Sequence, residues 1–300
     1  MEKRRLGQTD MDVSVLGFGA SEIGLENAAP GAVEELLKNA LEVGVNVIDT
    51  AECYRGSEEL IGNAISDRRN EFYLFTKCGH PHGMESAPNW SRDSILESIE
   101  RSLGRLKTDY LDLVQLHSCS EAELRKGEVV ETLQAARERG HTRYIGYSGD
   151  GHAARYAAEC GQFDALQLSI NIADQEAIDL TTPIAREKNL GVIAKRPIAN
   201  AAWKVGHKPI NFYHHEYWER LRKLNYDFLR DPDLEKTVGL ALRFTLSVPG
   251  VHTAIVGTKH PQRLRQNAKP LQEGPLDQAT YEAIRERWEE FAPRIWVGQV

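Results

Sequence analysis

The chain has 300 residues and a net charge of −7, with 41% hydrophobic residues and with acidic and basic side chains mixed along its length. This length can bury a large core, either as about two domains of ~150 residues or as one α/β barrel of ~250 residues or more. No basic tract or zinc-finger spacing is present, so nucleic acid is not an expected partner. No apolar segment follows the charged start as in a secretory signal, and no apolar run reaches the ~18 residues of a membrane span. Four cysteines are too few for a disulfide scaffold, so we expect a cytoplasmic protein without a membrane partner.

Eight short runs rich in β-branched residues alternate with longer amphipathic segments. Parallel strands that are buried on both faces read as near-continuous apolar runs, and eight such strands can close into a barrel. The predicted strands are residues 13–19, 45–50, 72–77, 111–117, 143–148, 163–170, 191–197 and 253–257. The sequence therefore predicts a single α/β domain over residues 1–300, a TIM (β/α)8 barrel with a short N-terminal extension.

An open, doubly wound sheet would show the same alternation of strands and helices. Its nucleotide-binding fingerprint, G-x-G-x-x-G, would follow the first strand and open a helix. Residues 17–22, GFGASE, lack the third glycine, and no helical pattern follows at once. This favours the closed barrel.

The segments between the strands have helical periodicity. In residues 31–41 the apolar side chains recur at i, i+3, i+4, i+7 and i+8, and they are Val33, Leu36, Leu37, Ala40 and Leu41. Ser91 is a predicted N-cap, and Gly140 is predicted to end a helix over residues 128–139.

Two segments depart from the alternation. Residues 198–233 are too long for an ordinary loop after the seventh strand, and in a barrel such insertions lie on the face where the chemistry occurs. We expect a flap beside the substrate, or alternatively an extra surface helix pair. Residues 271–300 are predicted to add a C-terminal helix, anchored by Leu276, Ile284, Trp288 and Phe291.

Polar residues end successive predicted strands. The second ends in Asp49, the third in Lys77 and the fourth in His117. In a barrel the C-terminal ends of the strands open into one mouth, where enzymes of this fold keep their catalytic groups. A single such residue is usually only the first solvated position of a loop, but three in consecutive strands predict an active site. The later strands continue the pattern with Ser148, with Gln167 and Asn171, and with Lys195 and Arg196.

Residues 49–62, DTAECYRGSEELIG, carry a specific pattern of Asp, Ala, Tyr, Gly, Ser and Glu. This segment resembles the signature of the aldo-keto reductase family. The similarity continues over essentially the whole chain, at residues 75–77, 108–117, 145–148 and 255–259. The resemblance implies a (β/α)8 barrel that reduces aldehydes or ketones, or oxidises alcohols, with a nicotinamide cofactor.

By this resemblance the catalytic residues are Asp49, Tyr54, Lys77 and His117. A phenol with a pKa near ~10 keeps its proton at neutral pH and can donate it to a carbonyl oxygen. We expect the Lys77 ammonium to lower the pKa of Tyr54, Asp49 to compensate the charge of Lys77, and His117 to hold the substrate carbonyl. Taken singly, the four have ordinary alternatives: a packing tyrosine, a helix-capping aspartate, a surface lysine and a core histidine.

No side chain supplies a hydride, so a cofactor is required. The resemblance assigns the nicotinamide half to positions near the strand ends, which here are Gly19, Ala20, Asp49, Ser148, Gln167, Asn171, Arg196 and Pro197. Two positions depart from the family pattern. Gly149 replaces an asparagine after Ser148, and Arg196 lies where a stacking aromatic residue is usual. Arg196 could stack through its planar guanidinium, or it could be a surface residue.

The adenosine phosphate half is assigned to the end of the eighth strand and the helix after it. The resemblance places it at Gly257, Thr258, Lys259, Arg263, Gln266 and Asn267. Backbone N–H groups at a helix start suit an anion, and Lys259 and Arg263 add positive charge for a 2′-phosphate. We therefore expect NADPH, with NADH possible, although these cations could equally form a solvated helix face.

Cysteines and histidines near the predicted mouth raise the question of a metal. Closely spaced cysteine pairs are absent, and adjacent residues of a strand such as Lys77 and Cys78 point to opposite sides. We expect no metal, which argues against a metal-dependent barrel hydrolase. A different alternative is a cofactor-binding regulatory subunit, similar to the channel-associated members of the family.

The substrate is less well defined. Trp90 and Trp203 could line an apolar pocket for a small carbonyl compound or a sugar, or they could only pack the surrounding loops. We expect a monomer or a weak homo-oligomer.

Overall fold

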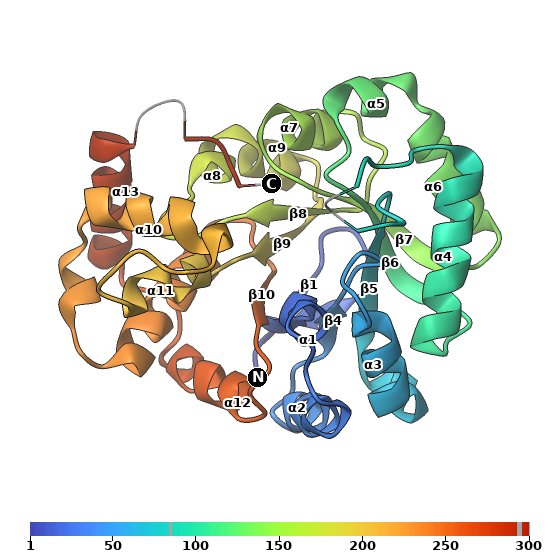
Figure 1. The fold of residues 1–300 in the computed structure, drawn as a ribbon. Helices are drawn as coiled ribbons and strands as arrows, with labels where there is room; N and C mark the ends of the chain where they lie inside the picture. The colour runs from blue at the N-terminus through green and yellow to red at the C-terminus, as the bar shows by residue number, and fades with distance from the viewer. Residues whose placement is uncertain (84–85, 293–295, 300) are drawn as a thin grey trace.

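Eight parallel strands form a closed barrel at the centre of the structure, a computed structural model that describes residues 1–83, 86–292 and 296–299. The strands follow one another around the barrel in chain order, and the last pairs with the first (Figure 1). They are β3 (Leu16–Gly19), β4 (Val47–Asp49), β5 (Tyr73–Cys78), β6 (Leu111–His117), β7 (Thr142–Ser148), β8 (Ala165–Ser169), β9 (Gly191–Lys195) and β10 (Thr253–Gly257). The predicted (β/α)8 barrel is confirmed.

Helices surround the barrel and cover its outer face (Figure 1). They are α1 (Ser21–Leu25), α2 (Pro30–Glu42), α3 (Ser57–Ile65), α4 (Arg92–Leu106), α5 (Glu121–Lys126), α6 (Glu128–Glu138), α7 (Gly151–Glu159), α8 (Glu176–Leu180), α9 (Thr182–Glu187), α10 (His215–Leu224), α11 (Leu234–Ser247), α12 (Arg263–Ala268) and α13 (Gln278–Phe291). Short 3-10 turns cover residues Ser66–Glu71, Ala199–Lys204, Phe212–His214, Asp227–Arg230 and Pro270–Glu273.

The predicted helix signals agree with these bounds. Four residues of the apolar stripe on α2 are buried against the barrel, and Leu41 is partly buried. The Ser91 side chain accepts a hydrogen bond from Ser94 N and caps α4. Gly140 follows α6 with φ +77°, a left-handed conformation that glycine adopts without strain.

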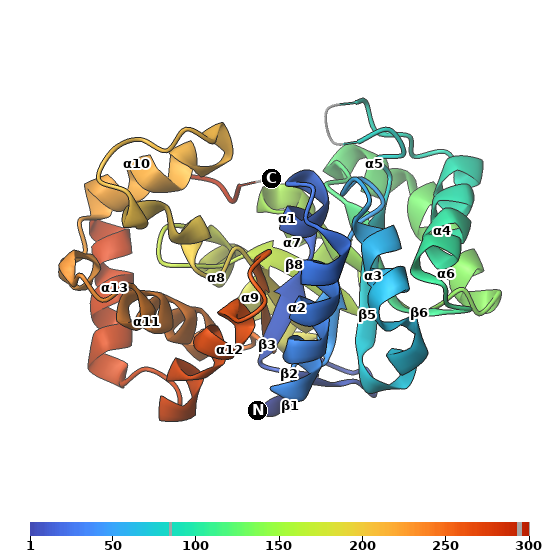
Figure 2. The same cartoon turned by 60° about the horizontal axis from the view of Figure 1, so that its bottom comes forward.

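The first predicted strand is wrong in its bounds, because residues 13–19 divide between two elements. Residues Asp12–Ser14 form β2, which pairs antiparallel with β1 (Lys3–Arg5), and only Leu16–Gly19 joins the barrel. The two elements are both apolar and adjacent, so they read as one run. Figure 2 shows the β1–β2 hairpin at the end of the barrel opposite α1.

The hairpin closes the lower end of the barrel with apolar side chains. Leu6, Met11 and Val13 are fully buried and pack on an inward-facing layer from the strands, made of Val47, Phe75, Leu113, Ala165, Ile193 and Ile255. Gly7 lies between them with φ +54°, and a Cβ there would be 2.3 Å from Gly191 N. Only glycine fits this close approach.

The inward positions change from apolar to polar two residues further along the strands, since side chains of a strand alternate between its faces. This upper layer contains Asp49, Lys77, Gln115, Gln167 and Lys195, all buried. The strand register sets these groups side by side, with Lys77 paired to Gln115 and Ser148 paired to both His117 and Gln167. The polar strand ends therefore meet at one mouth, as the sequence predicts.

The insertion after β9 forms three 3-10 turns and α10, and α10 packs on the first turn and on α13. The predicted C-terminal helix is α13, whose residues Ile284 and Trp288 are buried. Phe291 is 38% exposed, so its predicted role as an anchor is wrong. Residues 293–295 and 300 of the predicted C-terminal segment lie outside the described residues. Residues 296–299 return to the barrel mouth, where Gln299 contacts Ser169 and Asp174.

Candidate active site

A buried ion pair lies at the centre of the mouth. The Lys77 ammonium, at the end of β5, donates to Asp49 Oδ1 at the end of β4 and to Thr50 O at 2.8 Å. Both side chains are almost inaccessible to solvent. Asp49 Oδ2 accepts two more hydrogen bonds, from Gln115 Nε2 at 3.2 Å and from Gln167 Nε2 at 2.8 Å. The charges are therefore compensated and hydrogen-bonded, which is what makes an ion pair tolerable without water.

Tyr54 lies above this pair, in the loop between β4 and α3. The loop is fixed by Ser57, whose hydroxyl donates to Ala20 O at 2.9 Å and contacts Thr50 Oγ1 at 2.9 Å. The Lys77 Nζ atom lies 5.1 Å from the centroid of the Tyr54 ring. The sequence reasoning thus places the lysine beside the tyrosine correctly.

The pKa of Tyr54 is raised overall and not lowered as expected, because other effects outweigh Lys77. Desolvation raises the pKa of Tyr54 well above its usual value, Cys53 and Asp49 raise it further, and Arg196 opposes them. Lys77 is directed at the ring face and is compensated by Asp49, so its charge does not dominate at the phenol. Tyr54 consequently holds its proton firmly at neutral pH.

His117 completes the cluster from the end of β6. Its ring meets that of Tyr54 edge-on, with centroids 5.9 Å apart, and its Nδ1 lies 3.4 Å from Cys53 Sγ. His80 Nε2 donates to His117 O at 2.9 Å and holds its backbone. Burial lowers the pKa of His117 well below its usual value, and the neighbouring cations Lys77 and Lys195 act in the same direction. The imidazole is therefore neutral at physiological pH.

The residues predicted to contact the nicotinamide lie on the next strand ends. Ser148 Oγ donates to Gln167 Oε1 at 3.2 Å, and Gln167 in turn donates to Asp49. Asn171 follows β8 and is fully buried, and its Oδ1 accepts from Ala173 N at 2.8 Å. The glycine at position 149, where the family has asparagine, fits its surroundings, since a Cβ at this position would be 2.4 Å from the Tyr147 hydroxyl.

Arg196 is not a freely exposed residue. Its guanidinium donates to Ser169 Oγ at 2.8 Å, to Tyr213 Oη at 2.5 Å and to Gln299 O, and it lies 5.2 Å from the centroid of the Tyr213 ring. Its backbone has φ +55°, an unusual conformation for a non-glycine residue. Arg196 is therefore a partly buried, hydrogen-bonded residue at the mouth.

A second buried ion pair lies beside Arg196. Lys195 Nζ donates to Asp150 at 2.8 Å, and Asp150 also accepts from Ser169 N at 2.7 Å. Burial lowers the pKa of Lys195, while the Asp150 carboxylate opposes that shift. The mouth therefore carries two ammonium groups, each with its own carboxylate.

The turn after β9 has a strained backbone. Ala199, Asn200 and Ala201 are three consecutive residues with positive φ, of +45°, +54° and +47°. Such conformations cost free energy in non-glycine residues and cluster at binding sites. The amide nitrogen Nδ2 of Asn200 and that of Asn267 in α12 are buried without a hydrogen-bond partner in the described part of the chain.

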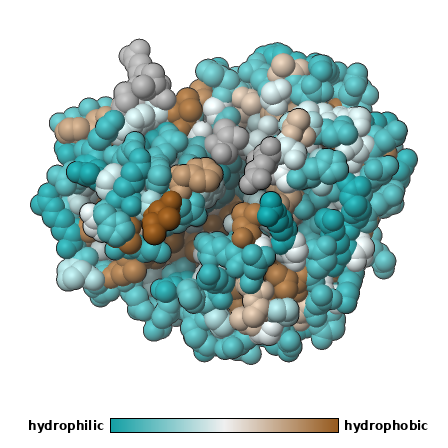
Figure 3. Space-filling model, viewed as in Figure 1, coloured by the Kyte–Doolittle hydropathy of each residue, from teal (hydrophilic) through white to brown (hydrophobic). Residues whose placement is uncertain are grey.

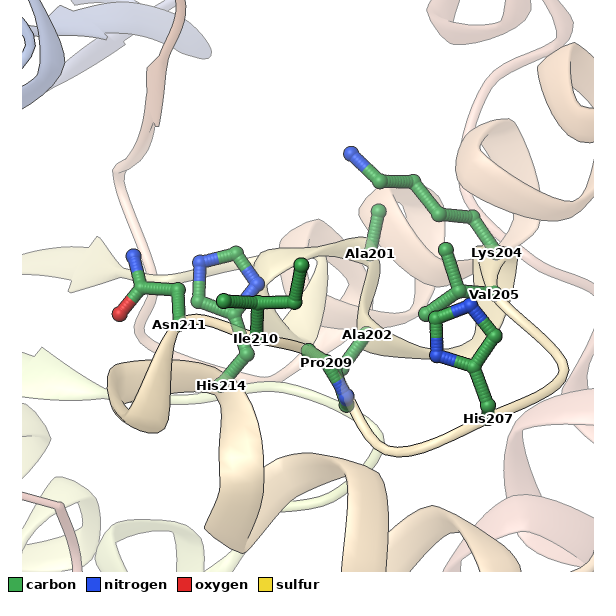
Figure 4. A pocket seen from close by; sticks show the side chains of 9 residues that line it. All are labelled: Ala201, Ala202, Lys204, Val205, His207, Pro209, Ile210, Asn211 and His214. Carbon is green, nitrogen blue, oxygen red and sulfur yellow. The ribbon is translucent and has the colours of Figure 1, made fainter.

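The same turn borders a pocket of about 240 Å³, which Figure 4 shows from close by. Its polar lining is Lys204, His207, Asn211 and His214, and its apolar lining is Ala201, Ala202, Val205, Pro209 and Ile210. The space-filling model, viewed as in Figure 1, shows a hollow near the middle of the face toward the viewer, with apolar side chains at its edge (Figure 3).

The residues predicted for the adenosine phosphate lie along β10 and α12. Lys259 is engaged in a 2.6 Å ion pair with Glu26, whereas the Arg263 guanidinium makes no hydrogen bond or ion pair with the residues described. Thr258 Oγ1 accepts from His260 N and shapes the turn, and Gln266 is half-buried. Gly257 pairs with Gly19 in the barrel, so these two predicted residues are adjacent.

Three further predicted residues also have a clear place. Ala20 N donates to Asp49 O at 2.8 Å, and Pro197 O accepts from Thr245 Oγ1 at 2.8 Å. Trp90 lies over Gly79 and meets the His80 ring edge-on, with centroids 5.9 Å apart.

Trp203 has a packing role. Its indole nitrogen donates to Thr237 Oγ1 in α11 at 3.3 Å, and the side chain packs on the hydrophobic core. This is the alternative that the sequence left open.

Nowhere in residues 1–83, 86–292 and 296–299 do three or more His, Cys, Asp or Glu side chains converge as a metal site would require. The four cysteines are all free, and Cys78 packs in the outer core while Lys77 faces inward. A helix long and apolar enough to cross a membrane is not found among those described.

Gln115 and Asp150 belong to this mouth and are not indicated by the sequence, which raises Cys53 and His80 as metal candidates and not as partners of His117. Gln115 lies two residues before His117, so the two-residue period of the strand could have indicated it. Asp150, Cys53 and His80 lie in loops, where no periodicity shows which way a side chain points. Their roles depend on contacts between distant parts of the chain.

Comparison with known proteins supports the same conclusion as the fold. The family model that matches is the Aldo/keto reductase family, over residues 15–289. The oxidoreductase YqkF of Bacillus subtilis is 29% identical, over 95% of this chain and 96% of that protein. L-galactose dehydrogenase of Arabidopsis thaliana is 31% identical over 66% of each chain. Among solved structures, the holo form of the aldo-keto reductase AKR11C1 from Bacillus halodurans superimposes with a TM-score of 0.83, at 26% identity and 96% coverage of both chains. The chain therefore belongs to the aldo/keto reductase family and is an NAD(P)H-dependent oxidoreductase.

Proposed function

We propose that this protein reduces aldehydes or ketones to alcohols, or catalyses the reverse oxidation, by hydride transfer with NADPH and with Tyr54 as the proton donor. The observation that carries the proposal is the buried Lys77–Asp49 pair, which lies below Tyr54 and beside His117. A surface lysine or a packing tyrosine would not need this arrangement. The proposal gives each of the four residues a task.

Tyr54 and His117 would bind the carbonyl oxygen together. Their rings meet edge-on at the mouth, so one oxygen could accept a hydrogen bond from the Tyr54 hydroxyl and another from His117. Neutral His117 adds no charge that would trap the product. The firm hold of Tyr54 on its proton is no obstacle, because the alkoxide formed on reduction is a stronger base than a phenolate.

Lys77 and Asp49 would act on Tyr54 after the proton has left. The phenolate is negative, and the Lys77 ammonium over its ring stabilises that charge. Asp49 keeps Lys77 charged and in place through the hydrogen bond at its Oδ1. In the reverse direction the same phenolate would take the proton from the alcohol.

The chain offers groups that fit a nicotinamide dinucleotide. The buried, unpartnered amides of Asn200 and Asn267 and the strained turn at residues 199–201 are what a bound phosphate-containing ligand would satisfy. The residues that would hold the nicotinamide half are Ser148, Gln167, Asn171, Arg196, Pro197, Gly19 and Ala20. The cofactor supplies the hydride when bound.

We propose NADPH as the preferred cofactor because the Arg263 guanidinium, at the predicted 2′-phosphate position, makes no hydrogen bond or ion pair within the described part of the chain. Lys259 is engaged by Glu26, so it contributes less than the sequence indicates. Gln266, Asn267, Gly257 and Thr258 would hold the adenosine half.

The substrate is proposed to be a small carbonyl compound or a sugar. Trp90, held against His80 next to His117, would form an apolar wall of the pocket. The name of the plant relative, a sugar dehydrogenase, is compatible with a polyhydroxylated substrate. We further propose that residues 1–300 act as one domain, in the cytoplasm, as a monomer or weak homo-oligomer.

A substrate panel tests this proposal. Aldehydes, ketones and sugars or their alcohols are offered to the purified protein with NADPH or NADP⁺, and with NADH or NAD⁺, while nicotinamide absorbance is followed. Steady turnover supports the proposal. Tight cofactor binding with negligible turnover across the panel contradicts it and supports a regulatory subunit instead.

A further inference from the structure

One contact at the mouth bears on which nitrogen of His117 carries a proton. Cys53 Sγ lies 3.4 Å from His117 Nδ1, and both side chains are buried. Cys53 precedes Tyr54, in the same loop between β4 and α3. This is the hydrogen bond that the structure gives to the His117 ring, while its Nε2 has no partner among the residues described.

Both groups are uncharged, so the tautomer of the imidazole sets the direction of this hydrogen bond. Burial raises the pKa of the Cys53 thiol to about 12, so it is an uncharged S–H group. Burial lowers the pKa of His117 well below its usual value, so the imidazole carries one N–H only. A thiol that donates to Nδ1 therefore requires the imidazole proton to be on Nε2.

We propose that Cys53 is a positioning residue whose S–H donates to His117 Nδ1 and keeps the imidazole proton on Nε2, where it can donate to the substrate carbonyl oxygen. This proposal rests on the function proposed above for the mouth. A ring nitrogen must carry a proton to donate a hydrogen bond to a carbonyl oxygen. The proposal names Cys53 as the group that keeps this proton on Nε2 of His117.

The other groups around His117 do not explain the tautomer. His80 bonds to the backbone oxygen of His117 and meets its ring only edge-on, at 5.6 Å between centroids. The neighbouring cations Lys77, Lys195 and Arg196 disfavour a second proton on the ring, and in the part of the chain that the structure describes none of them makes a hydrogen bond to it. Cys53 is the group in contact with Nδ1.

Nitrogen-15 NMR of histidine-labelled full-length protein tests the proposal without turnover. His117 signals are assigned by their loss in His117→Gln. We expect a pyridine-type shift for Nδ1 and a pyrrole-type shift for Nε2. Cys53→Val, which removes the donor and keeps an apolar side chain of comparable size, should move part of the pyrrole-type signal to Nδ1. Cys53→Ser, which restores a donor, should restore proton occupancy at Nε2.

Kinetics and a matched cysteine give the control. In Cys53→Val, kcat/KM should fall about five-fold, the factor associated with one hydrogen bond of ordinary strength. Cys78→Ala removes another buried thiol, whose Sγ donates to Gln115 O at 3.7 Å, and should leave the His117 shifts unchanged. Cys53→Ala replaces the valine variant if the latter does not fold.

Two results would overturn the proposal. One is a wild-type spectrum with the proton on Nδ1, and the other is an unchanged tautomer in the valine and alanine variants. Both are read from NMR shifts, so a chain that reduces none of the carbonyl compounds offered would contradict the proposed function and still test this hydrogen bond.

Discussion

Lys77 holds a positive charge where water does not reach it, and its side chain is only 1% exposed. Removing water from an ammonium costs several kcal/mol unless a carboxylate compensates it. Asp49 does so, and Gln115 and Gln167 satisfy the remaining carboxylate oxygen. At the scale of single residues, the centre of the mouth is therefore a compensated buried charge.

The first prediction concerns this pair. Asp49→Asn leaves the Lys77 charge buried and should lower the free energy of unfolding by about 3–5 kcal/mol, measured by urea denaturation. The double variant Asp49→Asn/Lys77→Met removes both charges and should regain most of that stability without regaining activity. If the single variant were as stable as the wild type, the pair would not be the compensated buried charge described above.

The second prediction concerns Arg263, the candidate for the 2′-phosphate. Arg263→Leu should raise the KM for NADPH at least ten-fold, since a charge-assisted contact of about 1.5–3 kcal/mol is lost, and should change the KM for NADH little. Arg265→Leu is the control, because Arg265 lies in the same helix but pairs with Glu42 at 3.3 Å. Equal effects of the two substitutions would exclude a specific phosphate contact.

The sequence predicts the positions of Asp49, Lys77 and His117 well, because each ends an apolar run and strand ends share one mouth. It does not predict the pKa of Tyr54. That value depends on desolvation and on the balance of Asp49 and Arg196, which come from different strands. Contacts of this kind are fixed only by the closed barrel.

At the scale of elements, residues 296–299 are the least expected part of the site. They follow α13 and end against the candidate residue Arg196, which donates to Gln299 O. Gly298 N donates to Glu176 at 2.6 Å, and Gln299 N donates to Asp174 at 3.1 Å. No periodicity in the sequence indicates this return, because an extended segment of four residues carries too few positions to show one.

The third prediction concerns this segment. A Cβ on Gly298 would be 2.4 Å from Asp150 Cβ, and Asp150 cannot move because it compensates Lys195. Gly298→Ala should therefore displace residues 296–299 and break the hydrogen bonds of Gln299 with Arg196 and Tyr213. Faster hydrogen exchange of the Gly298 and Gln299 region and a several-fold higher substrate KM are expected.

Gly104→Ala is the control for this test, because a Cβ in that part of α4 has open space around it. Unchanged exchange and KM in Gly298→Ala would show that the segment does not hold Arg196 in place.

At the scale of the whole molecule, the two ends of the barrel have separate tasks. The lower end is closed by the β1–β2 hairpin with Leu6, Met11 and Val13, and the upper end carries the charged groups. The sequence predicts the barrel because eight strands buried on both faces leave a repeated apolar pattern. It does not separate the hairpin from the first barrel strand, since Val13 and Leu16 are both buried and follow one another closely.

The fourth prediction tests this separation of tasks. Gly7→Ala forces a Cβ to within 2.3 Å of Gly191 N and an alanine into a left-handed backbone. It should lower the free energy of unfolding by about 2–4 kcal/mol, measured by urea denaturation, while kcat and KM of the folded protein stay near wild type. Gly31→Ala, which meets nothing within 4 Å, is the neutral control. A loss of kcat in Gly7→Ala without a loss of stability would contradict the separate tasks of the two barrel ends.

The most direct test of the whole account is the rate of a single turnover in Tyr54→Phe. Reduction is started by mixing protein saturated with NADPH and a carbonyl substrate from the panel, and the loss of nicotinamide absorbance is followed. Tyr144→Phe, at the opposite end of the barrel where Tyr144 bonds to Asp10, is the control. The account predicts that Tyr54→Phe is at least about 100-fold slower than wild type, with NADPH affinity unchanged and with Tyr144→Phe normal. A Tyr54→Phe variant that reduces the substrate at the wild-type rate would contradict it.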